Sequence, residues 1–311
     1  MSGTPAVPEQ DDGAAMVVAP RAREAVARLE RSERMRLSYL EALAEPVPLV
    51  PLPHDFEAIF DQLGAEVPNA VAAVARLRDE TRLRAAAGVR ALSFRPLLLA
   101  GPPGVGKTRF ARRLAAALGL PSAAISLAGA SDSRELEGTA RGWATAQPCW
   151  ALDQVATLGV ANPLLVVDEV DKCSRGGRNG DPLAALLPFL EPGTALAHRD
   201  PVLGAPCDLS GVSWVLAAND AWRLPGPLLS RVRVVEMEPP PAEAFAAVLA
   251  AIRGDLAAEF GCAPELLPVL EHADLAWLER RWYEAPSPRV LRKLVERLLG
   301  AAAARRPARL N

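Results

Sequence analysis

The feature that most constrains this chain is a glycine-rich loop between an apolar run and a helical pattern. Residues 97–119 read LLLAGPPGVGKTRFARRLAAALG, and after the loop apolar side chains recur at helical intervals over residues 107–118. This order predicts a buried strand, a tight turn and an amphipathic helix. Glycines let a backbone aim its N–H groups at phosphate oxygens, and a helix N-terminus adds a partial positive charge. The segment therefore predicts a phosphate-binding P-loop.

The loop supplies the groups that a nucleotide needs. We expect the Lys107 ammonium to reach the β- and γ-phosphates of ATP and the Thr108 hydroxyl to ligate Mg²⁺. An ordinary glycine turn before a helix is the alternative, but glycines, a lysine and a hydroxyl at these fixed positions seldom coincide by chance. The predicted nucleotide-binding residues of the loop are Gly101, Pro102, Pro103, Gly104, Val105, Gly106, Lys107 and Thr108.

A second acidic motif follows another apolar run. Leu164–Val167 predicts a buried strand, and Asp168 and Glu169 come directly after it. Open α/β sheets bind ligands beyond the carboxyl ends of their strands. We expect Asp168 to hold Mg²⁺, usually through water, and Glu169 to polarise the attacking water. The alternative is a solvated turn formed by these acids with Asp171 and Lys172, and the upstream P-loop disfavours it.

Short apolar runs alternate with helical segments through the middle of the chain. This alternation is typical of a parallel sheet with helices packed on its faces. The expected strands are Pro96–Ala100, Ala123–Leu127, Leu164–Val167, Ser213–Ala217 and Val232–Glu236. The expected helices cover residues 107–118, 148–158, 181–190 and 225–231, and the chain after Pro241 is helical again.

The N-terminal part has a different pattern. Residues 1–19 are rich in Pro, Gly and Asp and predict a disordered tail. Arg21–Glu45 predicts one charged helix, with a coiled coil as the alternative, and the proline-rich residues 46–53 predict a stiff linker. Two further helices are expected at Asp55–Leu63 and Pro68–Ala87.

Composition limits the classes of function. The 311 residues include 35 basic and 37 acidic side chains, so no basic excess favours nucleic acid as a partner. The N-terminus carries acidic residues where a secretion signal needs a positive start. No run of eighteen apolar residues occurs. We therefore expect a cytoplasmic protein without a membrane span.

The motifs GPPGVGKT and VVDEVDK resemble those of the AAA+ ATPases. Further stretches follow the order and spacing of the ATPase module of the Lon family, namely GVANPLLVVDEVDK, GDPLAALLPFLEP, CDLSGVSWVLAAND and LPGPLLSRVRVVEM. The resemblance covers about residues 65–300. It implies an α/β/α P-loop sandwich with a parallel sheet, followed by a small α-helical lid. It also implies a homo-oligomer, in the form of a ring, that binds Mg²⁺ and ATP between subunits and hydrolyses ATP to ADP and phosphate.

Patterns and resemblance together predict four parts. They are a disordered tail over residues 1–19, an N-terminal helical region over 20–88, a P-loop AAA+ core over 89–240 and a helical lid over 241–311.

The resemblance implies three further site residues. Asn219 ends an apolar strand and matches the sensor-1 position, where an amide orients the attacking water; a buried-turn asparagine is the alternative. Arg231 matches the arginine finger that points into a neighbouring subunit's ATP, and Arg233 competes for that role. Arg289 matches the sensor-2 arginine of the lid, although Arg292 and other arginines stand close by.

The chain also departs from the Lon pattern. Lon proteases continue after the lid into a peptidase domain with a Ser–Lys pair, and we expect no peptidase here because the sequence ends soon after Arg289. Lon-like pore loops place an aromatic residue in the segment that corresponds to Glu135–Trp143. Ala140 stands at the expected position, and Trp143 is the nearest aromatic residue, with a place in the core as its alternative.

The leading hypothesis is an ATP-driven motor that remodels or unfolds a protein substrate, alone or for a partner chain. The alternative is a nucleotide-gated assembly or regulatory protein without translocation activity. Complete hydrolysis motifs favour the motor, and the altered pore loop favours the alternative. A clamp loader or DNA-remodelling ATPase ranks last because the sequence lacks a basic patch.

Overall fold

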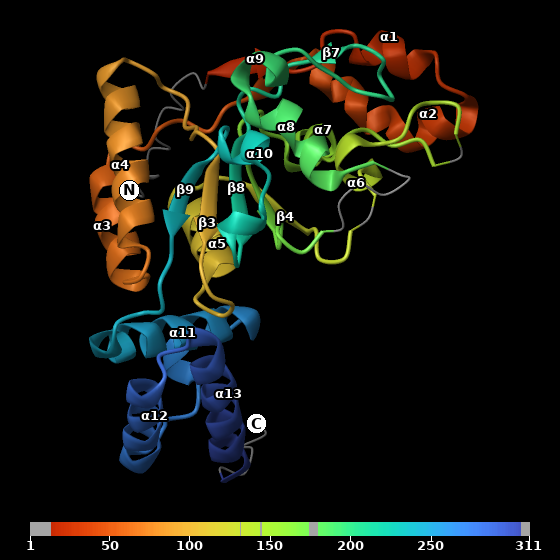
Figure 1. Ribbon diagram of the computed structural model, residues 1–311. Helices are drawn as coiled ribbons and strands as arrows, with labels where there is room; N and C mark the ends of the chain where they lie inside the picture. Colours follow the sequence, from red (N-terminus) through yellow and green to blue (C-terminus); the bar gives the residue numbers. More distant parts are fainter. Residues whose placement is uncertain (1–13, 131, 144, 174–179, 306–311) are drawn as a thin grey trace, which may run out of the picture.

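The computed structural model describes residues 14–130, 132–143, 145–173 and 180–305 (Figure 1). A five-stranded sheet lies at the centre with helices on both faces, and a separate group of helices lies below the sheet in this view. This is the α/β sandwich with a following helical domain that the sequence predicts. Residues 1–13 of the expected tail lie outside the described residues.

The central sheet is parallel, with strand order β4-β5-β8-β3-β9. Every residue of β8 is buried, which explains its continuous apolar sequence. The first strand begins one residue later than predicted because Pro96 has no N–H to donate, although its carbonyl accepts a hydrogen bond from Arg233. The strands are β3 (Leu97–Ala100), β4 (Ser122–Ser126), β5 (Leu164–Asp168), β8 (Ser213–Ala218) and β9 (Arg233–Glu236).

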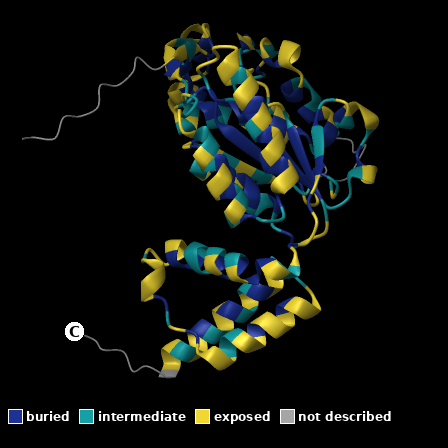
Figure 2. Ribbon diagram, turned by 90° about the vertical axis from the view of Figure 1, so that its left-hand side faces the viewer, coloured by how far each residue is buried: buried dark blue, intermediate teal, exposed yellow. Residues whose placement is uncertain are grey.

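Two apolar cores cover the two faces of the sheet. Successive residues of each strand point to opposite faces, so Leu97 and Leu99 join the core beneath α3, α4 and α5, whereas Leu98 joins the other core. That second core also contains side chains of α7 and α8. Figure 2 shows buried strands between half-exposed helices. The sandwich helices and the small hairpin are α3 (Phe56–Glu66), α4 (Val71–Ala86), α5 (Lys107–Ala117), α6 (Arg134–Glu137), α7 (Trp150–Leu158), α8 (Pro182–Leu190), α9 (Pro192–Ala195), β6 (His198–Arg199), β7 (Pro206–Cys207), η2 (Ala221–Arg223) and α10 (Gly226–Leu229).

The predicted long helix over Arg21–Glu45 is instead three short helices. They are α1 (Ala22–Ala27), α2 (Arg31–Leu37) and the 3₁₀ helix η1 (Ser38–Ala44). Breaking the helix lets apolar side chains from several faces reach the same core as α7 and α8, including Val26, Leu29 and Leu40. The periodicity predicted helical structure correctly, but the breaks between the helices are set by the burial of apolar side chains against the sheet.

The predicted tail and linker meet in a small sheet. Strand β1 (Ala15–Val17) pairs antiparallel with β2 (Pro46–Pro48), and Met16 lies opposite Val47. Val18 is fully buried. The prediction of a stiff linker over residues 46–53 is therefore wrong, and the described part of the 1–19 tail is ordered. Local composition signalled loops here because it carries no information about a partner strand thirty residues away.

One buried amide fastens this N-terminal part to the central sheet. Asn162, just before β5, has no exposed surface. Its side-chain oxygen accepts from the Val50 N–H at 2.8 Å, and its amide donates to the carbonyls of Val50 at 2.9 Å and Leu92 at 2.7 Å. Two chain segments that lead into α3 and β3 are thus held at the start of β5.

The C-terminal helices have an apolar core of their own. Leu278, Trp282 and Val295 are buried in it, and the Trp282 indole donates to the Ala242 carbonyl at 2.8 Å. No described helix is both long and apolar enough to cross a bilayer. The elements are η3 (Ala242–Ala244), α11 (Phe245–Glu259), η4 (Pro264–Leu266), α12 (His272–Glu284) and α13 (Pro288–Arg305).

We expect Asn162→Ala to lower the free energy of unfolding by roughly 2–4 kcal/mol, because it leaves buried backbone groups of Val50 and Leu92 without partners. Denaturant titration measures this change. Gln154→Ala is the control, since the Gln154 amide donates to the side chain of its neighbour Asp153, and it should cost less than about 0.5 kcal/mol. Equal effects of the two substitutions would contradict the fastening role.

Candidate nucleotide site

The loop between β3 and α5 has the backbone shape that its glycines predict. At Gly101 a Cβ atom would lie 2.1 Å from the carbonyl oxygen of Met237, so no side chain fits there. Gly106 has φ +103° and caps α5, a conformation that favours glycine. Val105 is buried in the core beneath the loop, so its role is to anchor the loop.

Lys107 is the centre of this arrangement. Only 8% of it is exposed. Its ammonium donates to the carbonyl oxygens of Gly101 at 2.7 Å and Pro102 at 3.1 Å, and to the side-chain oxygen of Asn219 at 3.0 Å. Burial lowers the pKa of Lys107, and the carboxylate of Asp168 acts in the opposite direction. A cation held this way presents a fixed positive charge to the cavity.

Thr108 and Asp168 form an oxygen pair at the end of β5. The Thr108 hydroxyl donates to Asp168 at 2.5 Å, and the other carboxylate oxygen accepts from the Glu169 N–H at 2.8 Å. Among the described residues no group of three or more His, Cys, Asp or Glu side chains forms a metal site. A hydroxyl beside one carboxylate instead fits Mg²⁺, which keeps several waters and takes phosphate oxygens.

Glu169 occupies a constrained turn. It is the one described non-glycine residue with a positive φ, at 55°. One carboxylate oxygen accepts from the Ser126 hydroxyl at 3.2 Å, and the other is ion-paired with Lys172. The Lys172 hydrogen bond holds the pKa of Glu169 below its usual value. Strained residues of this kind often occur at functional sites.

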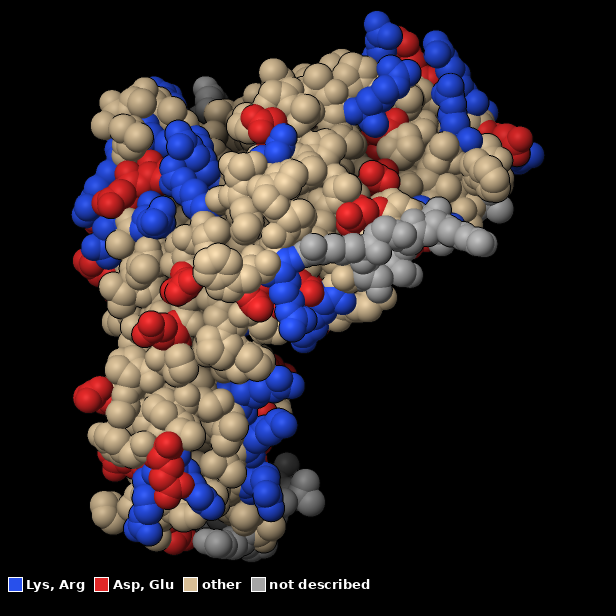
Figure 3. Space-filling view, in the orientation of Figure 1, with Lys and Arg blue, Asp and Glu red and all other residues tan. Residues whose placement is uncertain are grey.

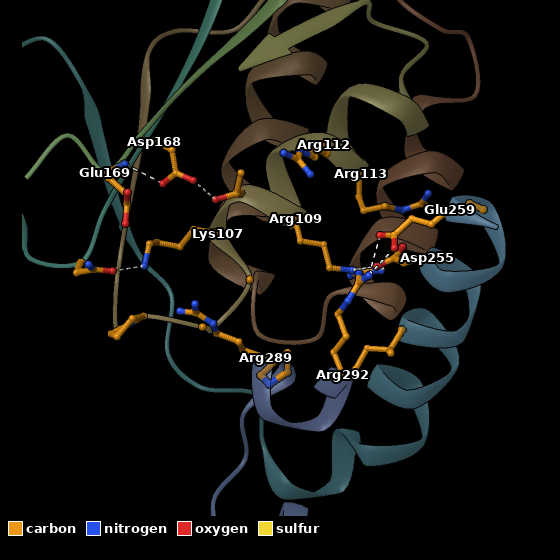
Figure 4. A pocket seen from close by; sticks show the side chains of 18 of the residues that line it. Lys107, Arg109, Arg112, Arg113, Asp168, Glu169, Asp255, Glu259, Arg289 and Arg292 are labelled. Carbon is orange, nitrogen blue, oxygen red and sulfur yellow. Dashed lines mark hydrogen bonds and ion pairs between the residues drawn. The ribbon is translucent and has the colours of Figure 1, made fainter. Parts of the chain in front are cut away.

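A cavity of about 520 Å³ joins these groups to the lid. Figure 4 shows Lys107, Asp168 and Glu169 on one side and arginines from α5 and α13 on the other. Arg289 approaches the loop closely, because a Cβ added to Gly104 would lie 3.1 Å from the Arg289 Cβ. Basic side chains also gather above and below the notch between sandwich and lid in Figure 3. This volume and polarity suit a polyanionic small molecule.

Ion pairs hold the lid against the sandwich, and the sequence motifs do not predict them. The Arg109 guanidinium bonds to Glu66 of α3 at 2.9 Å and to Asp255 of α11 at 2.5 Å. Arg113, one turn along α5, also bonds to Glu66 at 2.8 Å. The four-residue spacing of these arginines was visible in the sequence, but their partners were not.

Arg231 and Arg233 do not line this cavity. Arg231, after α10, donates to the Pro227 carbonyl at 2.9 Å and lies 3.3 Å from Glu191. Arg233 is paired at 2.7 Å with Glu80 of α4, a carboxylate that is almost fully buried. The two candidates for the finger are exposed to the same degree, with 31% of the Arg231 side chain and 32% of the Arg233 side chain accessible. They differ in their partners: Arg233 pairs with a buried carboxylate, whereas Arg231 pairs with the exposed carboxylate of Glu191.

Trp143 does not pack in the core, so the alternative that the sequence left open, a core residue, is wrong. It is 68% exposed. It lies in a hairpin closed by a bridge between Thr139 and Gln147. Ala140, at the position where an aromatic residue was expected, is exposed in the same hairpin.

Comparison with known proteins agrees with this geometry. Residues 97–239 match the family described as "ATPase family associated with various cellular activities (AAA)". The mitochondrial Lon protease homolog of Phaeodactylum tricornutum is 41% identical over 141 residues, which are 45% of this chain and 16% of that protein. The peroxisomal Lon protease homolog 2 of Pichia angusta is 41% identical over 141 residues, 45% of this chain and 15% of that protein. Residues 97–239 are therefore similar to the AAA+ module of the Lon proteins.

The extent of the likeness is limited. The chain spans less than a fifth of the length of these curated relatives. A cryo-EM reconstruction of Hsp104 with ATPγS and FITC-casein in a closed state superposes with a TM-score of 0.60 at 17% identity, over 90% of this chain and 49% of that one. This second likeness concerns the fold, and it includes regions outside the AAA+ module.

Proposed function

We propose that the chain binds ATP with Mg²⁺ in the cavity between AAA+ module and lid and hydrolyses it to ADP and phosphate. The observation that carries this proposal is the convergence of Lys107, Thr108, Asp168, Glu169 and Asn219 on one cavity. They come from the ends of the neighbouring strands β5 and β8 and from the N-terminus of α5. The family model that matches residues 97–239 is described as an ATPase family, which supports the proposal.

Each side chain then has a role that its surroundings support. The N–H groups of Gly104, Gly106 and the first turn of α5 bind phosphate oxygens, and Lys107 neutralises their charge. Thr108 and Asp168 hold the magnesium, which when bound withdraws charge from the phosphates. Glu169 accepts a proton from the attacking water.

Asn219 lies at the end of β8, between the strands that carry the loop and the acids. We propose that its amide orients the attacking water. Arg289 reaches the same cavity from the lid, so it can contact the γ-phosphate and report nucleotide occupancy to α13. A guanidinium suits this role because it is always charged and binds two oxygens at once.

Arg231 is proposed to complete the site of a neighbouring copy. It lies outside the cavity of its own chain, and its partner Glu191 is exposed, so an approaching second copy can replace that ion pair. The pair with Glu80 makes Arg233 the weaker candidate, because reaching across an interface would take one cation from a buried carboxylate and leave it only Arg84 and the Arg95 N–H among the described residues. The assembly that this arrangement supports is a ring of identical subunits.

We propose that the ring remodels or unfolds a protein substrate. The exposed Trp143 favours a motor over a purely regulatory assembly, because an indole displayed on a hairpin offers apolar area to a polypeptide. Gly138 and Gly142 have φ values of 81° and 88°, a conformation that glycine adopts without strain and that shapes this part of the chain. A regulatory assembly would need no such displayed side chain.

We expect Lys107→Ala to reduce ATP affinity by at least about a hundredfold, because charge-assisted contacts to the phosphates are lost. The fold should persist, since the freed acceptors face a solvated cavity. Isothermal titration with ATP and a thermal melt measure the two effects. Lys293→Ala is the matched control, as this exposed lysine of α13 does not line the cavity. Unchanged affinity in Lys107→Ala would reject the site.

Glu169→Gln should bind ATP as the wild type does but hydrolyse it roughly 10²–10⁴-fold more slowly, because the amide keeps the shape and cannot accept a proton. A steady-state phosphate-release assay with a parallel binding titration separates the two effects. Asp171→Asn, two residues away and outside the cavity lining, should hydrolyse ATP at close to the normal rate. Turnover within a few-fold of normal in Glu169→Gln would show that another group accepts the proton.

Arg231→Ala should lower turnover by roughly 10³-fold or more while each subunit still binds ATP. Mixing it with Glu169→Gln should restore part of the activity, because some mixed interfaces combine an intact Glu169 with a neighbour's intact Arg231. Arg233→Ala should mainly lower the melting temperature, since it breaks the pair with Glu80. If Arg233→Ala restores activity when mixed with Glu169→Gln and Arg231→Ala does not, the arginine finger is Arg233. If neither variant restores activity, the site is not shared between subunits.

A further inference from the structure

The hairpin that displays Trp143 is fastened to a helix more than a hundred residues away in the sequence. We define the Trp143 hairpin as residues 139–143 and 145–147. Backbone hydrogen bonds between Thr139 and Gln147 close it, at 2.8 and 3.1 Å, and the Ala146 N–H donates to the Trp143 carbonyl at 2.8 Å. These bonds shape the hairpin but do not fix its direction relative to the sandwich.

Two side chains of α2 fix that direction. Glu33 is 91% buried, and its carboxylate accepts from the Gly142 N–H at 3.1 Å. Arg36 donates from its guanidinium to the Ala146 carbonyl at 2.8 Å. The two side chains are three residues apart on α2, so they lie on one face of the helix. They hold the hairpin backbone on both sides of Trp143.

The helix that provides these contacts is itself anchored. Leu37 at its end and Leu40 and Leu43 just after it are buried in the core shared with α7. The Tyr39 hydroxyl bonds to Asp153 of α7, and burial together with this carboxylate raises the pKa of Tyr39. The hairpin is therefore fastened to a platform that belongs to the sandwich, while the indole at its end stays exposed.

We infer that Glu33 and Arg36 are positioning residues that hold the Trp143 hairpin ready to engage an unfolded polypeptide. This inference rests on the proposed remodelling function and gives the N-terminal segment a part in it. A polypeptide fits better than a nucleic acid, because the exposed charges of residues 134–141 are balanced, with Arg134 and Arg141 against Glu135 and Glu137. Phosphate backbones need a cationic excess.

The decisive experiment combines hydrogen exchange with a stimulated ATPase assay on Glu33→Ala and Arg36→Ala in the full chain. We expect exchange in peptides covering residues 139–147 to rise about tenfold, since each substitution removes a charge-assisted hydrogen bond. We also expect the half-saturating concentration of a reduced, alkylated protein to rise at least about fivefold, because a hairpin free to turn must be ordered again on binding. Rates are normalised to each variant's own basal rate.

Matched variants separate positioning from general damage. Arg34→Ala lies on the same helix, but its guanidinium bonds to the Leu29 carbonyl within the N-terminal segment, so exchange and stimulation should match the wild type. Glu33→Gln keeps an acceptor oxygen for the Gly142 N–H and should retain most of the stimulation. Thermal melts show whether the sandwich stays folded in each variant.

The outcomes distinguish this inference from the function on which it rests. Unchanged exchange in Glu33→Ala and Arg36→Ala, or faster exchange with normal stimulation, would overturn the positioning role and leave the remodelling function standing. Normal stimulation in Trp143→Ala would overturn the role of the indole. A wild type that hydrolyses ATP but responds to single-stranded DNA, or to no polymer, would overturn the remodelling function and the inference together.

Discussion

The half-buried ammonium of Lys107 is the group on which the candidate nucleotide site depends. Removing a cation from water is costly unless hydrogen bonds replace its hydration. Here the replacement comes from Gly101, Pro102 and Asn219, so the same bonds that stabilise the lysine also tie the loop to the end of β8. A shift of the loop would break these hydrogen bonds and leave the charge without acceptors. A phosphate that enters the cavity therefore meets a positive group already in place.

The order of the strands brings the remaining groups to this lysine. β8 lies between β3 and β5, and all three strands run in the same direction. Their carboxyl ends therefore meet at one edge, where the P-loop, Asn219 and Asp168 follow the three strands. Residues far apart in sequence become neighbours because parallel pairing fixes the register. The lid closes this edge through Arg109, which bridges α3 and α11 by bonds to Glu66 and Asp255.

The N-terminal segment, residues 15–48, packs on the face of the sheet that α7 and α8 cover. Its apolar side chains belong to the core of α7 and α8, so it is part of the sandwich and not an attached arm. Asn162 holds the chain at Val50, just after this segment, at the start of β5. Glu33 and Arg36 of the segment contact the Trp143 hairpin. The segment and β5 therefore share one apolar core, and α2 connects that core to the backbone of the Trp143 hairpin.

The sequence alone determined the features that local order encodes. Apolar runs followed by glycine or acidic motifs located β3 and β5, the P-loop and the residues Lys107 and Asp168, because each run needs burial and each motif needs a strand end. The tertiary structure alone decided which distant groups meet. The strand at 46–48, the Arg233–Glu80 pair and the α2–hairpin contacts follow no sequence period, since their partners lie thirty to more than a hundred residues away. Long-range pairing is set by packing against the sheet, and no local pattern records it.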